Sequence, residues 1–130
     1  MRIIIKVGTQ VIAGKNGLDQ KKIAKLIKEI SLLLKRGHEV VLVTSGAIGA
    51  GLPQVPFMNP HRKKIAAAIG QPLLIHDYIR EAKKYKFSIG QILILSDDFT
   101  NKERFKNFVS NIKAMLSHKI LPIINENDVM

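Results

Sequence analysis

The chain alternates short apolar runs with longer segments in which apolar residues recur at helical spacing. Each run is rich in β-branched residues and has the length of a strand buried in a sheet. The runs cover residues 2–7, 39–44, 87–95 and 120–124. Strands that alternate with helices are typical of parallel pairing through right-handed crossovers. The pattern therefore predicts an α/β fold, with an open, mostly parallel sheet and helices on both of its faces.

The first helical segment has clear ends. Asp19 can cap its start, and Gly37 is placed to end it in a left-handed conformation. Residues 8–18 before it are interpreted as a turn region that contains glycine. The first strand, residues 2–7, is interpreted as fully buried, and the last strand is expected to be interrupted by Pro122.

The other helical segments carry breakers and caps. Residues 61–85 include Gly70 and Pro72, which predicts two helical pieces or one helix kinked near that pair. Thr100 with Glu103 forms a capping box that predicts the start of the last helix. Three phenylalanines in this region are assigned to the core, namely Phe99, Phe105 and Phe108.

Composition limits the class of protein. A chain of 130 residues with 46% hydrophobic content fits one compact domain, 1–130, with a single core. No apolar run approaches the roughly 20 residues that a membrane span needs, and the start lacks the pattern of a secretory signal. The absence of cysteine excludes disulfides and thiolate metal sites, which fits a cytoplasmic location.

The net charge of +11 could attract nucleic acid, an acidic surface or a phosphorylated ligand. Charge alone does not choose among these. Most of the excess is lysine spread through the helical segments, which favours a solvated surface over a dedicated binding face.

The first candidate for chemistry is Lys6-Val7-Gly8-Thr9, at the end of the first strand. A cation followed by a residue without a side chain suits the approach of a phosphate to the backbone. The alternative is a lysine at a strand end that simply holds its ammonium in water.

The second candidate is the glycine-spaced loop from Thr44 to Gly51. Its glycines allow backbone N–H groups to face a carboxylate or a phosphate near the start of a helix. The spacing matches neither a P-loop nor a dinucleotide fingerprint. A tight turn between strand and helix is the alternative.

The third candidate is Asn125-Glu126-Asn127-Asp128, directly after a buried strand. Turn chemistry explains one amide and one carboxylate better than two of each. Carboxylate and amide oxygens accept hydrogen bonds from an ammonium, so the segment is predicted to bind a ligand amine.

Together these segments resemble the glutamate 5-kinases of the amino-acid kinase family, and the resemblance extends along essentially all of the chain. Besides the three candidates, the matching segments are Ala68-Ile69-Gly70-Gln71, Gly90-Gln91-Ile92-Leu93 and Glu103-Arg104-Phe105. Gln10 departs from a usual small hydroxyl residue, and residues 52–62 form a shorter, more proline-rich loop than expected.

The resemblance implies a kinase that uses ATP and Mg²⁺, with the magnesium held mainly through ATP and no metal-ligating residue in this chain. Lys6 would be catalytic beside the transferring phosphate, with Gly8 and Thr9 also binding phosphate or ATP. The implied substrate-binding residues are Ser45, Gly46, Ala47, Asn125 and Asp128. L-Glutamate and ATP would be its ligands, with proline as a feedback inhibitor, a homo-oligomeric state, and no nucleic-acid or membrane partner.

The resemblance also implies that 1–130 corresponds to the amino-terminal, glutamate-binding lobe. The ATP-binding half and the PUA-type domain at the carboxyl end of many members have no counterpart here, so the isolated chain is expected to be inactive alone. Three other hypotheses stay open: a different amino-acid kinase, a non-catalytic basic α/β module that binds nucleic acid, and a structural fragment that serves only in assembly.

Overall fold

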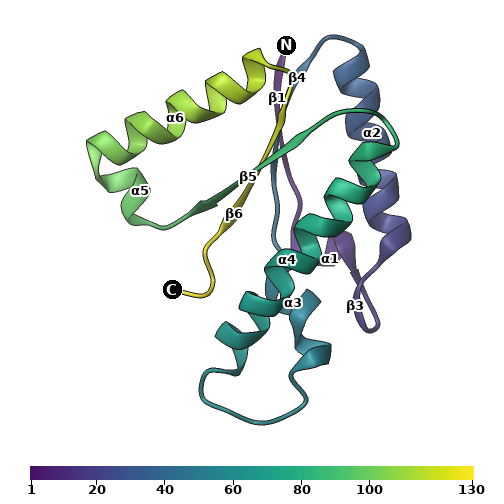
Figure 1. Ribbon diagram of the computed structural model, residues 1–130, viewed down its shortest axis with the longest axis vertical. Helices are drawn as coiled ribbons and strands as arrows, with labels where there is room; N and C mark the ends of the chain where they lie inside the picture. The colour runs from purple at the N-terminus through teal and green to yellow at the C-terminus, as the bar shows by residue number, and fades with distance from the viewer.

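A computed structural model describes residues 1–130, and its centre is a four-stranded parallel sheet (Figure 1). The strands are β1 (Arg2–Lys6), β4 (Glu39–Val43), β6 (Leu121–Glu126) and β5 (Ile89–Ile94), in that spatial order. All three pairings are parallel. The predicted α/β class and parallel sheet are confirmed.

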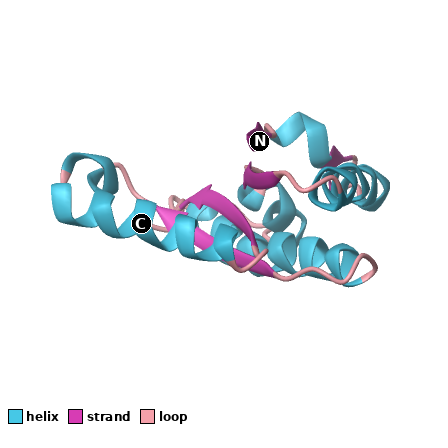
Figure 2. Ribbon diagram, turned by 90° about the horizontal axis from the view of Figure 1, so that it is seen from above, coloured by secondary structure: helices cyan, strands magenta, loops and turns pink.

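Helices cover both faces of the sheet (Figure 2). On one face, α2 (Gln20–Lys35) and α4 (Arg62–Lys83) enclose the main core. On the other, α6 (Lys102–Ser117) packs on a smaller cluster. In β4 the side chains alternate between the two, since Val40 and Leu42 lie in the main core and Val41 lies under α6.

Strand β1 is not fully buried, contrary to the sequence-based expectation. Ile4 is 70% exposed, on the same face of the strand as Lys6, which is also exposed. The reason is position: β1 is an edge strand, and α6 packs on β4, β5 and β6 without covering it.

The expected interruption of the last strand at Pro122 is also wrong, because β6 is continuous and central. Alternate residues of a parallel strand bond to opposite neighbours. Leu121 donates to Ser88 beside β5 at 2.9 Å, so the missing N–H of Pro122 faces β4. On that side the β4–β6 pairing begins with Leu42 opposite Ile123, directly after the proline. Pro122 therefore limits how far this pairing extends toward the start of β6, but it does not break the strand.

Residues 8–18 contain more structure than a turn region. They form α1 (Thr9–Ile12) and a hairpin of β2 (Ala13–Gly14) and β3 (Gly17–Leu18). Lys22 Nζ donates to the carbonyl of Ala13 at 2.9 Å, which ties the hairpin to α2. Asp19 caps α2 as predicted, accepting from the amides of Lys21 and Lys22.

Helix α4 runs without a break through Pro72, so the first of the two alternatives, two separate helical pieces, is wrong. The proline removes the amide that would donate to the carbonyl of Ala68. Both residues are exposed, and water can satisfy that carbonyl. Before α4 lie α3 (Ala47–Gly51) and the 3₁₀ turn η1 (Leu52–Gln54).

The capping prediction for α6 is wrong by one residue. Asn101, rather than Thr100, is the N-cap, and its side chain accepts from the amide of Arg104 at 3.1 Å. Thr100 instead ends a separate short helix, α5 (Asp97–Thr100), and its hydroxyl donates to the carbonyl of Asp97.

The phenylalanine assignment is partly wrong. Phe108 packs on the cluster under α6, but Phe99 and Phe105 are 51% and 44% exposed. The three rings contact one another at the start of α6, with centroids 5.6 to 6.5 Å apart.

No helix of the chain combines the length and apolarity needed to cross a membrane.

Candidate functional site

The three candidate segments leave the sheet at the same edge, because β1, β4 and β6 are parallel neighbours. The amide of Val7 donates to the carbonyl of Val43 at 2.8 Å, and the amide of Thr44 donates to the carbonyl of Ile124 at 2.9 Å. These bonds join the ends of the three strands in a row. The carboxyl ends of strands are where open α/β sheets bind ligands.

Hydroxyl groups link the first two segments. Ser45 Oγ donates to the carbonyl of Val7 at 3.3 Å and lies 3.3 Å from Thr9 Oγ1. The structure therefore brings together Thr9 and Ser45, which are 36 residues apart in the chain. This contact supports a shared role for two segments that the sequence had only placed at the same edge.

The loop after β4 depends on a glycine. Gly46 has φ of 106°, a backbone conformation that L side chains rarely adopt. A Cβ there would also lie 3.0 Å from Ile12 Cδ1. The amides of residues 45–48 donate to no protein acceptor, so Gly46 and Ala47, both buried, present unsatisfied donors.

Lys6 and Gly8 differ in what constrains them. Lys6 is the last residue of β1, is exposed, and has no carboxylate within ion-pair distance. Its ammonium is free to meet an anion. Gly8 has an ordinary extended φ of −78°, and a Cβ there would meet nothing within 4 Å. The absence of a side chain at Gly8 leaves open space rather than relieving strain.

Asn125 lies within β6 and is 4% exposed. Its Nδ2 donates to Gln71 Oε1 at 2.9 Å, and its Oδ1 accepts from the amide of Glu126 at 2.9 Å. Both ends of the amide thus have protein partners. Gln71 had been noted in a matching segment without a role, and the structure shows that it fixes the rotamer of Asn125.

Asp128 follows β6 in a turn and is half-buried. Burial raises the pKa of its carboxyl above the ordinary value of 3.8, and the nearby charge of Glu126 raises this pKa further. It forms no ion pair within the chain. Its carboxylate is therefore available to a cation from outside.

The position of the loop is set by a backbone contact between α3 and α4. A Cβ on Gly51 would lie 1.9 Å from the carbonyl oxygen of Ala66, and one on Gly70 would lie 1.7 Å from that of Ala47. The two helices touch through their main chains, which only glycine allows. This contact fixes α3, and with it the loop that begins at Thr44.

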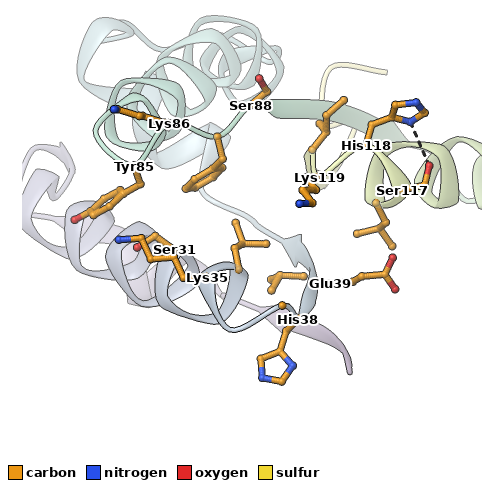
Figure 3. A pocket seen from close by; sticks show the side chains of 16 residues that line it. Ser31, Lys35, His38, Glu39, Tyr85, Lys86, Ser88, Ser117, His118 and Lys119 are labelled. Atoms are coloured by element: carbon orange, nitrogen blue, oxygen red, sulfur yellow. Dashed lines mark hydrogen bonds between the residues drawn. The ribbon is translucent and has the colours of Figure 1, made fainter.

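A cavity of about 770 Å³ lies at the opposite, amino edge of the sheet (Figure 3). It is lined by the ends of α2 and α6, the start of β4 and the segments that connect α4 to β5 and α6 to β6, and it contains none of the predicted site residues. The chain also holds no group of three or more His, Asp or Glu side chains placed to bind a metal ion.

Sequence reasoning missed Tyr78 of α4. Its hydroxyl lies 2.7 Å from Thr44 Oγ1, directly beneath the glycine-spaced loop. In sequence it is one apolar position among several on a helix, and no local signal separates it from ordinary core residues.

Comparison with known proteins agrees with this geometry. The sequence profile of the amino acid kinase family matches residues 1–130. Glutamate 5-kinase 1 of Bacillus subtilis is 40% identical over 134 residues, covering 98% of this chain and 36% of the relative. Glutamate 5-kinase of Thermoanaerobacter sp. is 42% identical over 136 residues, covering 100% of the chain and 36% of the relative.

A third relative, the glutamate 5-kinase of Teredinibacter turnerae, is 38% identical over 99% of the chain. In each case the chain spans about a third of the relative's length. The profile match covers the whole chain and agrees with the parallel α/β sheet. The chain therefore belongs to the amino acid kinase family.

Proposed function

We propose that this chain is the glutamate-binding lobe of a glutamate 5-kinase, which transfers the γ-phosphate of ATP to the side-chain carboxylate of L-glutamate in proline biosynthesis. The observation that carries the proposal is the junction at the carboxyl edge of the sheet. There Thr9, which follows β1, contacts Ser45, which follows β4. Lys6 at the end of β1 and Asp128 after β6 form no ion pair within the chain. Glutamate is proposed as the substrate because the relatives are named glutamate 5-kinase.

The chemistry needs positive groups more than proton transfer. A glutamate carboxylate with an ordinary pKa of about 4.3 is already ionised at neutral pH, so the nucleophile requires no general base. The difficulty is to bring two anions together in line. Lys6, whose ammonium has no internal partner, would neutralise charge on the transferring phosphoryl group.

Recognition of the amino acid divides between two segments. Asp128 would accept hydrogen bonds from the α-ammonium of glutamate. The Ser45 hydroxyl and the amides of Gly46 and Ala47 would donate to a carboxylate, and the lack of protein acceptors for the two amides supports this role. Asn125, held by Gln71, would also contribute to substrate binding.

Magnesium is assigned no ligand in this chain, which lacks a cluster of carboxylates or imidazoles suited to a metal. The ion would arrive with the phosphates of ATP. When bound, it supplies charge neutralisation on the phosphate oxygens. A cytoplasmic location, proline as a competing ligand and self-association belong to the same proposal.

Calorimetric titration of the chain with L-glutamate and with L-aspartate tests the proposal. We expect glutamate to bind more tightly, and Asp128→Asn and Ser45→Ala each to weaken its binding, about tenfold for the charged contact. Ser117→Ala is the matched control, because Ser117 is exposed and bonds only locally at the end of α6. Equal affinity for both amino acids, or no effect of Asp128→Asn, would contradict the assignment.

The pH dependence sharpens the test. Glutamate binding needs an ionised Asp128, so affinity should fall as the pH drops toward its raised pKa, above 3.8. Stability should respond in the opposite direction at this group. A carboxyl whose pKa is raised in the folded state favours folding when protonated, so its contribution grows as the pH falls and is lost as the pH rises through the folded pKa. Asp128→Asn should remove both responses.

A further inference from the structure

Two buried hydroxyl groups lie beneath the Ser45–Gly46 peptide. Tyr78 of α4 has no exposed surface, and Thr44 is 5% exposed. The Tyr78 hydroxyl lies 2.7 Å from Thr44 Oγ1, and Thr44 Oγ1 lies 3.1 Å from the carbonyl oxygen of Ser45. A continuous chain of hydrogen bonds therefore runs from the core to the loop.

The direction of the protons follows from the end of this chain. The Ser45 carbonyl can only accept, so the Thr44 hydroxyl donates to it. Thr44 Oγ1 has then used its single proton and must accept from Tyr78. The pKa of Tyr78 is raised from 10.0 to about 12. Burial raises this pKa, and the hydrogen bond with Thr44 offsets only part of the rise. The phenol thus keeps its proton at neutral pH.

The orientation of one carbonyl fixes the amide next to it. In a planar trans peptide the C=O and the following N–H point in opposite directions. Because Thr44 holds the Ser45 carbonyl, the Gly46 N–H is turned away from the hydroxyl pair.

Gly46 is buried, and its amide donates to no protein acceptor. Burying an amide without an acceptor is unfavourable. Such a group, held in one orientation at the substrate edge, indicates an acceptor supplied from outside the chain.

We propose that Tyr78 and Thr44 are positioning residues that turn the Gly46 N–H toward an anionic ligand. Resting on the proposed function, that ligand is a carboxylate of L-glutamate. Neither hydroxyl touches the ligand. Tyr78 acts through Thr44, and Thr44 acts through the peptide that follows Ser45.

The first arm of the test uses the ligand-free chain. Tyr78→Phe and Thr44→Val each remove one hydroxyl with little change of shape, and Thr44→Ser restores the second hydroxyl. Tyr85→Phe is the matched control, since Tyr85 is the only other tyrosine and lines the cavity at the opposite edge.

The readout is the Gly46 ¹⁵N resonance and the Ser45 carbonyl ¹³C resonance, which respond to a hydrogen bond on that carbonyl. We expect both to move in Tyr78→Phe and Thr44→Val and to return in Thr44→Ser. If Thr44→Val does not fold, Tyr78→Phe decides. Shifts no larger than those in Tyr85→Phe would overturn the proposal.

The second arm measures L-glutamate binding by the same variants. Loss of one neutral hydrogen bond should weaken binding about fivefold in Tyr78→Phe and Thr44→Val, with near wild-type affinity in Thr44→Ser and Tyr85→Phe. Unchanged affinity in all variants would overturn the positioning role. Failure of the wild-type chain to bind glutamate would instead refute the proposed function, and the resonances of the ligand-free chain would still decide whether the hydroxyl pair sets the peptide.

Discussion

The two edges of the sheet turn the chain in different ways. At the amino edge, α2, α4 and α6 are each followed by a residue in the left-handed region: Gly37, Lys86 and Lys119, with φ of 85°, 62° and 58°. At the carboxyl edge, Gly17 and Gly46 are left-handed, with φ of 108° and 106°, and a Cβ on Gly46 would also lie 3.0 Å from a side-chain atom of Ile12. The turns at the amino edge require only a backbone angle, whereas Gly46 also requires the absence of a Cβ.

This difference separates two costs that glycine can relieve. A Cβ on Gly37 would meet nothing within 4 Å. Lysine occupies the equivalent turns after α4 and α6, where the left-handed conformation costs about 1–2 kcal/mol per residue. A Cβ on Gly51 or Gly70 would overlap a main-chain carbonyl, which cannot move as a side chain can. Tolerance to substitution should therefore differ sharply between the two edges.

The largest expected effect is at the α3–α4 contact. Gly70→Ala places a Cβ 1.7 Å from the Ala47 carbonyl oxygen, so the helices must separate. We expect a loss of more than about 3 kcal/mol in the free energy of unfolding, measured by urea titration. Gly49→Ala, on α3, is the control. Its Cβ would be 3.8 Å from Thr9 Cγ2, and it should be neutral or slightly stabilising. Equal midpoints for the two variants would refute the contact argument.

The next effect comes from the buried phenol. The folded state holds the pKa of Tyr78 at about 12, against an ordinary value of 10.0. The unfolded chain therefore loses this proton at lower pH. Its contribution is complete below pH 10 and falls away as the pH rises to 12, by about 3 kcal/mol. Unfolding measured across this range should be steeper in pH for the wild type than for Tyr78→Phe. Parallel curves would show that the phenol is not insulated from water.

The smallest effects should appear at the amino edge, with opposite signs at equivalent turns. Lys86→Gly relieves a left-handed backbone and should stabilise by up to about 1 kcal/mol, whereas Gly37→Ala introduces the same strain and should destabilise by about 1 kcal/mol. Thermal unfolding of the two variants side by side measures both. A shift of the same sign in both would show that the backbone angle is not what distinguishes these turns.

The sequence predicted the features that arise from local pattern. Apolar runs and helical spacing were enough to predict the four strands of the main sheet and α2. Asp19 was predicted to cap α2, and the structure confirms it as the N-cap. The misses depend on neighbours distant in sequence. The exposure of Ile4 follows from strand order, and the tolerance of Pro122 follows from the side of β6 on which pairing is short.

The candidate site shows the same division. Strand ends placed Lys6, Ser45 and Asp128 at one edge without knowledge of the sheet order. The contacts that hold the site come from α4, through Gln71 and Tyr78. Their partners lie 54 and 34 residues away, a separation that no local motif encodes.

The placement of the two tyrosines has a practical consequence. The chain has no tryptophan, so its near-ultraviolet absorbance and emission come chiefly from Tyr78, under the loop at one edge of the sheet, and Tyr85, beside the cavity at the other. Replacing either with phenylalanine leaves a single chromophore whose spectrum reports on one edge alone. The molecule carries its own optical label at each end of the sheet.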